Sequence, residues 1–76
     1  MEQTKVRYRV RLDDWKDILA FSKIAANIPT DVTLVSGHHR LNAKSFLGIA
    51  LARMSWEDME VECDYDCYED FERFIR

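Results

Sequence analysis

The sequence predicts an α+β fold in which helices cover one face of a four-stranded antiparallel sheet. Its 76 residues suffice for one domain, spanning residues 1–76. Apolar residues recur at every second position in some segments and at helical spacing in others. In chain order these segments give β-α-β-β-α-β-α, with no repeat and no linker. Helices and sheets with one apolar face pack as two layers, so an open-faced β-sandwich is expected.

The first two elements differ clearly in their apolar spacing. Residues 4–11 alternate strictly, which is typical of a strand with one buried face and one wet face. Residues 13–28 are predicted to be helical, and Pro29 beyond them cannot continue the helix. The apolar residues at helical spacing in this segment are Trp15, Ile18, Phe21, Ala25 and Ile28.

A hairpin and a short apolar helix follow. Residues 31–36 and 39–43 are predicted strands, joined by a two-residue turn of glycine and histidine. A second helix begins near Ser45 and runs through the most apolar part of the chain, residues 41–54. Serine is a favoured N-cap residue, so its hydroxyl is expected at the N-terminus of this helix.

The acidic end of the chain supplies the last strand and helix. Residues 58–64 alternate between apolar and acidic side chains, which predicts the fourth strand. Residues 66–75 have helical spacing, and Asp66 with Glu69 resembles a capping box at its start.

The wet faces of the first and fourth strands carry opposite charges. Cross-strand pairs of opposite charge stabilise a sheet, so these two strands are expected to be neighbours. Right-handed crossovers through the first two helices then give the strand order 1-4-2-3. The side chains expected to face one another are Lys5, Arg7, Arg9 and Arg11 on one strand and Glu60, Glu62 and Asp64 on the other.

Composition excludes several function classes. The net charge is −3, with acidic residues concentrated after residue 53, whereas a nucleic-acid binder usually shows a net basic face. No apolar run reaches the ~18 residues of a membrane span. The N-terminal stretch lacks a signal-peptide core, so we expect a cytoplasmic protein. The cysteines and the adjacent histidines make a weak metal pattern, and neither a metal nor a cofactor is expected; they are Cys63, Cys67, His38 and His39.

The stretch "NAKSFLG", residues 42–48, carries a family resemblance. At the start of the second helix of this topology, it resembles HPr, the histidine-containing phosphocarrier protein of the bacterial sugar phosphotransferase system. HPr proteins have "NAKS" here, then an apolar pair and a glycine. The resemblance covers nearly the whole chain and implies the HPr-like open-faced sandwich and partner proteins linked to sugar transport.

The phosphate-accepting motif of the family is degenerate in this chain. HPr proteins open their first helix with Gly-Leu-His-Ala/Thr-Arg-Pro, whose histidine receives phosphate from phosphoenolpyruvate through enzyme I. Here Asp14 falls at the histidine position, Asp13 precedes it and Lys16 replaces the arginine. Since an imidazole is the nucleophile in that transfer, we expect no histidyl phosphotransfer and no enzyme activity. The alternatives are an acyl phosphate on Asp14, or aspartates that simply cap the helix.

Ser45 matches the family, and so do apolar residues behind it. In many relatives a kinase phosphorylates this serine, and the modified protein binds a transcriptional regulator. Ser45 is therefore the candidate regulatory phosphorylation site; the alternative is a helix cap only. The residues that match the family's exposed docking patch, or lie near it, are Phe46, Leu47, Ala50 and Trp15. Periodicity does not decide whether Phe46 and Leu47 face the core or a partner.

These observations lead to one preferred function and two alternatives. The preferred hypothesis is an HPr-related protein-binding module, regulatory in role, that has lost phosphotransfer through histidine. The first alternative is a working phosphocarrier that uses Asp14 as its acceptor. The second alternative is a structural or oligomer-forming domain with no link to sugar transport.

Overall fold

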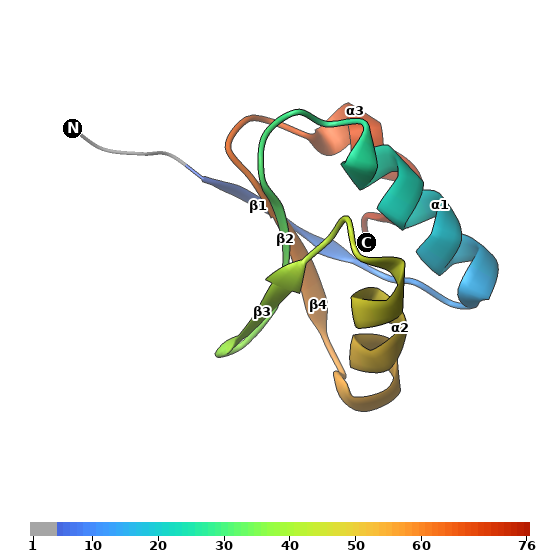
Figure 1. Cartoon of the computed structure of the whole chain (residues 1–76). Helices are drawn as coiled ribbons and strands as arrows, with labels where there is room; N and C mark the ends of the chain where they lie inside the picture. Colours follow the sequence, from blue (N-terminus) through green and yellow to red (C-terminus); the bar gives the residue numbers. More distant parts are fainter. Residues whose placement is uncertain (1–4) are drawn as a thin grey trace.

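The structure is a computed structural model that describes residues 5–76 (Figure 1). Residues 1–4 lie outside the described residues; they include Thr4, predicted to begin the first strand, and part of the stretch searched for a signal peptide. The elements in chain order are β1 (Val6–Val10), α1 (Trp15–Ala26), β2 (Val32–Ser36), β3 (His39–Asn42), α2 (Phe46–Ser55), β4 (Met59–Cys63), α3 (Tyr68–Phe71) and the 3-10 turn η1 (Glu72–Phe74).

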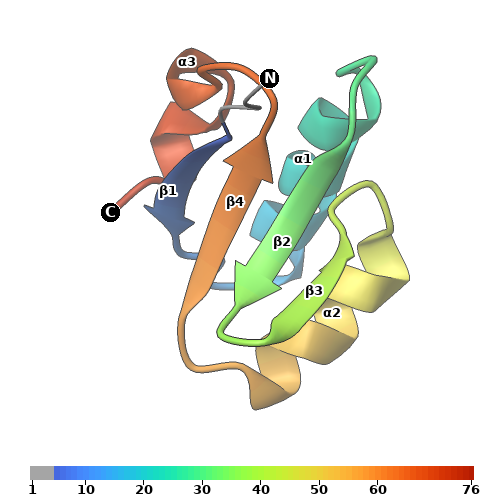
Figure 2. The ribbon, with the colours of Figure 1, turned by 90° about the vertical axis from the view of Figure 1, so that its left-hand side faces the viewer.

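The four strands form one open antiparallel sheet in the order β1-β4-β2-β3. The three α-helices lie together behind this sheet when its other face is viewed directly (Figure 2). The predicted α+β class and the strand order 1-4-2-3 are confirmed. The pairing of β1 with β4 places Arg7 opposite Glu62 and Arg9 opposite Glu60, as the charge pattern predicted.

The core lies between the helices and the sheet. Alternation along β4 buries Met59, Val61 and Cys63 on the helix side. Aromatic rings of α1 and α3 meet there, and the ring centroids of Phe21 and Phe71 are 4.8 Å apart. The largest fully buried side chains are Phe21, Phe71, Phe74, Leu34 and Ile49.

The hairpin between β2 and β3 is as tight as predicted. Ser36 pairs with His39, so only Gly37 and His38 form the turn. Gly37 has φ +60°, a left-handed conformation that glycine adopts without steric cost. This turn sets the register that brings Arg40 over the open face of the sheet, the face turned away from the helices.

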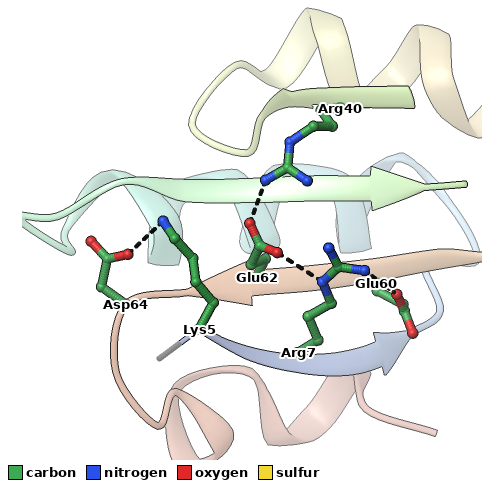
Figure 3. A network of polar contacts seen from close by, with 6 residues as sticks. All are labelled: Lys5, Arg7, Arg40, Glu60, Glu62 and Asp64. Carbon is green, nitrogen blue, oxygen red and sulfur yellow. Dashed lines mark hydrogen bonds and ion pairs between the residues drawn. The ribbon is translucent and has the colours of Figure 1, made fainter. Parts of the chain in front are cut away.

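An ionic network covers that open face (Figure 3). Lys5 pairs with Asp64 at 2.8 Å, and Arg7 Nε donates to Glu62 Oε2 at 2.7 Å. The Arg40 guanidinium donates to the other oxygen of Glu62, whose side chain is only 5% exposed. Two of the basic residues predicted to pair with acidic residues of β4 do not do so. Arg11 pairs with its neighbour Asp13, and Arg9 makes no ion pair within 4 Å among residues 5–76; the remaining contact is Arg7 Nη1 to Glu60 Oε1 at 3.5 Å.

The structure corrects the extent and orientation of the first helix. Helix α1 ends at Ala26, so Ile28 lies in the loop beyond the helix, although its side chain still belongs to the core. Trp15 has the spacing of a core residue but is 61% exposed. Trp15 is the first residue of α1, and the first residue of this helix that is buried in the core is Ile18.

The tail departs further from its predicted single helix. Residue Cys67 is the N-cap of α3, and no side chain caps that helix. Asp66 instead accepts hydrogen bonds from the hydroxyl of Tyr8 and the backbone of Tyr68, so the predicted capping box is absent. The α-helix gives way to η1 because Ile75 forms a bridge with Val10 of β1, which requires extended backbone.

Candidate functional site

Ser45 caps helix α2, as the sequence predicted. Its backbone is extended, and its Oγ accepts a hydrogen bond from the Gly48 amide at 3.1 Å. The turn before it is held by Asn42, whose side chain accepts from the Lys44 amide at 2.9 Å. The Ser45 residue is exposed, so its hydroxyl is positioned at the surface end of the helix. An exposed serine at a helix N-terminus suits phosphorylation electrostatically, because the helix dipole favours negative charge there.

Gly48 leaves room for this cap. A Cβ atom at Gly48 would lie 3.1 Å from Ser45 Oγ and 3.4 Å from Ser45 Cβ. The first contact is tighter than ordinary van der Waals packing. The glycine therefore replaces the glutamate of a full capping box and keeps the serine hydroxyl close to the first helical turn.

Helix α2 turns one face to the core and the opposite face to solvent. Ile49 and Ala52 are buried and fix the helix to the sheet. Three large side chains follow one another at i, i+4 and i+7 spacing on the side away from the core. This α2 apolar stripe consists of Leu47, Leu51 and Met54, which are 67%, 60% and 83% exposed.

The predicted docking residues take different positions around this stripe. Phe46 is 40% exposed beside Ser45, and Leu47 belongs to the stripe itself. Ala50 is half-buried and packs against the core. The exposed Trp15 stands at the start of α1, and α1 packs against α2.

Arg53 ties α2 to the start of α1. Its Nε donates to the carbonyl of Leu12 at 2.5 Å, and its Nη2 donates to the carbonyl of Asp13. It is the only charged residue in α2, and residues 32–56 contain no aspartate or glutamate.

Sequence reasoning missed Leu51 and Met54. Their i+4 and i+7 spacing from Leu47 was visible in the sequence. However, almost every position of this helix is apolar, so the pattern alone does not say which side faces the sheet. Packing of Ile49 and Ala52 against the core makes that choice.

Two of the aspartates at the start of α1 accept hydrogen bonds from backbone amides at the N-terminus of this helix. Asp14 is the N-cap, and its Oδ1 accepts from the Asp17 amide at 3.0 Å. Asp17 Oδ2 accepts in return from the Asp13 amide at 2.9 Å, and Asp13 also pairs with Arg11. Lys16 makes no ion pair among residues 5–76. The expected capping role of Asp14 is confirmed, and its carboxylate lies within one turn of two further carboxylates.

The sulfur and histidine side chains do not assemble a reactive centre. Cys63 and Cys67 are free and buried, and burial raises the pKa of both thiols, which keeps them protonated. His39 stacks on Trp56, with ring centroids 5.7 Å apart. Within residues 5–76, no three His, Cys, Asp or Glu side chains are grouped so that they could hold a metal ion.

No helix in residues 5–76 has the length and apolar character needed to cross a membrane. Comparison of the chain with protein families, curated proteins and solved structures finds no match. The site combines an exposed apolar stripe along α2 with an exposed serine at the N-terminus of the same helix.

Proposed function

We propose that this chain is a non-catalytic protein-binding module related to HPr, which docks its partners through the α2 apolar stripe and is regulated at Ser45. The observation that carries the proposal is the stripe itself. Three large apolar side chains, Leu47, Leu51 and Met54, are each at least 60% exposed on one helix face. A contiguous exposed apolar surface of this kind is typical of a partner-binding site.

The physical gain from docking comes from burying these side chains. Full burial of a leucine or methionine contributes about 1.5–3 kcal/mol relative to leaving it exposed. The helix itself is anchored by Ile49, Ala52 and Arg53, so its exposed face is presented on a rigid element. Little ordering of the site is then needed on binding, which favours affinity.

Ser45 is suited to control this docking. Phosphorylation would add about −1.5 to −2 charge at pH 7 directly beside Phe46 and Leu47. A partner that presents an apolar surface would bind more weakly, because that surface would meet a hydrated dianion. A partner with an arginine cluster would bind more tightly. Lys44 beside the serine adds a basic group on the same turn.

Two features support the relation to HPr rather than an unrelated binding domain. The sheet order and the helices on one face agree with the fold that the resemblance implies. The stretch with Ser45 also opens the second helix, as it does in that family. The absence of histidyl phosphotransfer is inferred from Asp14, which occupies the histidine position and caps α1.

The direct test is binding to the partners that HPr proteins use. Enzyme I and the regulator that recognises serine-phosphorylated HPr would be titrated into ¹⁵N-labelled protein, with and without prior treatment by the serine kinase and ATP. We expect amide shifts in α2 with at least one partner, and Leu51→Ser to weaken binding by roughly tenfold or more.

A matched control is available on another face. His38 is exposed in the turn between β2 and β3, so His38→Ser removes an exposed ring without changing α2. Its affinity for the partners should equal that of the parent chain. If neither partner moves the α2 amides, or if both variants bind alike, the proposed docking surface is wrong.

A further inference from the structure

A second surface, remote from α2, has a different chemistry. Three tyrosines converge at the outer edge of β1, and they come from three parts of the chain: β1, the loop before α3, and α3 itself. Helix α3 lies beside β1 at the upper left of Figure 2, whereas α2 lies at the lower right. The tyrosines and three acidic residues line a hollow of about 390 Å³; the lining residues are Tyr8, Tyr65, Tyr68, Asp66, Glu69 and Asp70.

The rings in this hollow are accessible. Tyr65 and Tyr68 are 41% and 42% exposed, although both are large aromatic residues. Tyr68 meets Tyr8 edge to face, with centroids 5.5 Å apart and ring planes at 69°. Because the two ring planes are steeply inclined, the faces of the two rings point in different directions within the hollow.

Two phenol hydroxyls hold two of the carboxylates. Tyr8 donates to Asp66 Oδ1 at 2.7 Å, and Tyr65 donates to Asp70 Oδ2 at 2.7 Å. The hydrogen bond to Asp66 raises the pKa of Tyr8 to about 12 and lowers that of Asp66, and the bond to Asp70 raises the pKa of Tyr65. The two hydrogen bonds hold the rings of Tyr8 and Tyr65 against these carboxylates.

The hollow carries unbalanced negative charge. Three of its six lining residues are acidic, and no basic side chain of residues 5–76 lines it. Within residues 5–76 no three carboxylates are grouped so that they could hold a metal ion, so the hollow does not suit a small, strongly hydrated cation. An organic cation suits it better, because its diffuse charge is attracted by aromatic faces and by nearby carboxylates.

We propose that this tyrosine-lined hollow binds an organic cation, an alkylammonium or guanidinium group. The proposal does not depend on the function of α2, because it involves other residues on another part of the molecule. Two sources supply this chemistry: a free quaternary amine, or the side chain of a basic residue in a peptide. Both place a cation against Tyr65 and Tyr68, with the carboxylates at its rim.

The test uses isosteres that differ only in charge. Calorimetric or NMR titration with choline chloride is compared with 3,3-dimethyl-1-butanol, which has the same shape without the charge, at constant ionic strength. N-acetyl-arginine amide forms the second arm and represents a peptide side chain. We expect choline, the arginine amide or both to shift the resonances of Tyr65 and Tyr68, and the neutral alcohol to leave them unmoved.

Substitutions then separate the ring from the hydroxyl. Tyr68→Leu removes an aromatic face and should weaken cation binding by roughly tenfold, whereas Tyr68→Phe keeps the face and should stay within about twofold. Tyr68 is exposed, so both variants are expected to fold, and circular dichroism checks this. The proposal is overturned if neither cation binds, if the neutral alcohol binds equally well, or if Tyr68→Leu binds cations like the parent chain.

Discussion

Glu62 is the residue whose neutralisation should cost most stability on the open face of the sheet. Its side chain is 5% exposed and accepts hydrogen bonds from the guanidiniums of Arg7 and Arg40. A buried hydrogen bond to a charged group contributes ~1.5–3 kcal/mol. Both arginines are about half exposed, at 47% and 49%, so solvent screening reduces that value. We therefore expect Glu62→Gln to lower the free energy of unfolding by about 1–2 kcal/mol in total.

Glu60 provides the matched control on the same strand and the same face. Its side chain is 42% exposed and lies 3.5 Å from Arg7 Nη1, so Glu60→Gln should cost about 0.5 kcal/mol or less. Urea denaturation followed by circular dichroism at pH 7 measures both values. Equal losses in the two variants would refute the argument that burial beneath two guanidiniums distinguishes Glu62.

The pH dependence of unfolding independently tests whether the ionised Glu62 carboxylate stabilises the fold. Burial alone would raise the pKa of Glu62, but the hydrogen bonds from Arg7 and Arg40 outweigh it and hold the pKa below its ordinary value. A lowered carboxyl pKa contributes stability that is present above the unfolded-state value and is lost as pH falls through the folded-state value. The deficit of Glu62→Gln should therefore shrink between pH 7 and about pH 2. A deficit that grows in acid would contradict this reasoning.

Three further predictions concern other parts of the chain. Ser45→Ala removes the α2 cap and should lower the free energy of unfolding by about 1 kcal/mol, whereas Ser55→Ala at the far end of α2 should have little effect; urea titration compares them. Phosphoenolpyruvate and enzyme I should give no phosphoryl adduct by intact-protein mass spectrometry, with an ordinary HPr as positive control, and a hydroxylamine-labile adduct on Asp14 would contradict this. Cys63 and Cys67 should react with Ellman's reagent only in denaturant, because both thiols are buried; rapid labelling of the folded chain would show this wrong.

The parts of the fold that the sequence predicted well are those in which charge and periodicity agree. The one-sided charges of β1 and β4 were sufficient to make these strands neighbours, because like charges on adjacent strands would repel one another. The cap at Ser45 was predictable as well, since a serine before an apolar helical run has a local role. The cap depends only on residues next to it in sequence, and the pairing of β1 with β4 depends only on the sign of the charges on their exposed faces.

Other features depended on contacts that local patterns do not encode. The tail loses its last helical turn because Ile75 bridges Val10, a residue far away in sequence. Leu47, Leu51 and Met54 are exposed because Ile49 and Ala52 occupy the only core face available to α2. The tyrosine-lined hollow joins β1 to a segment more than fifty residues later, so no pattern along the chain indicated it.

The position of β4 in the middle of the sheet has a consequence for how the chain folds. β4 is the last strand in sequence, yet both β1 and β2 pair with it. During synthesis the hairpin of β2 and β3 can form as soon as it leaves the ribosome, whereas β1 has no strand to pair with until β4 emerges. Bringing β1 and β4 together closes the long segment of chain between them, and this costs chain entropy before the pairing compensates for it. Folding is therefore slowed. Docking of β4 is therefore the step expected to limit the folding rate, and truncation before Met59 should leave β1 without a partner strand.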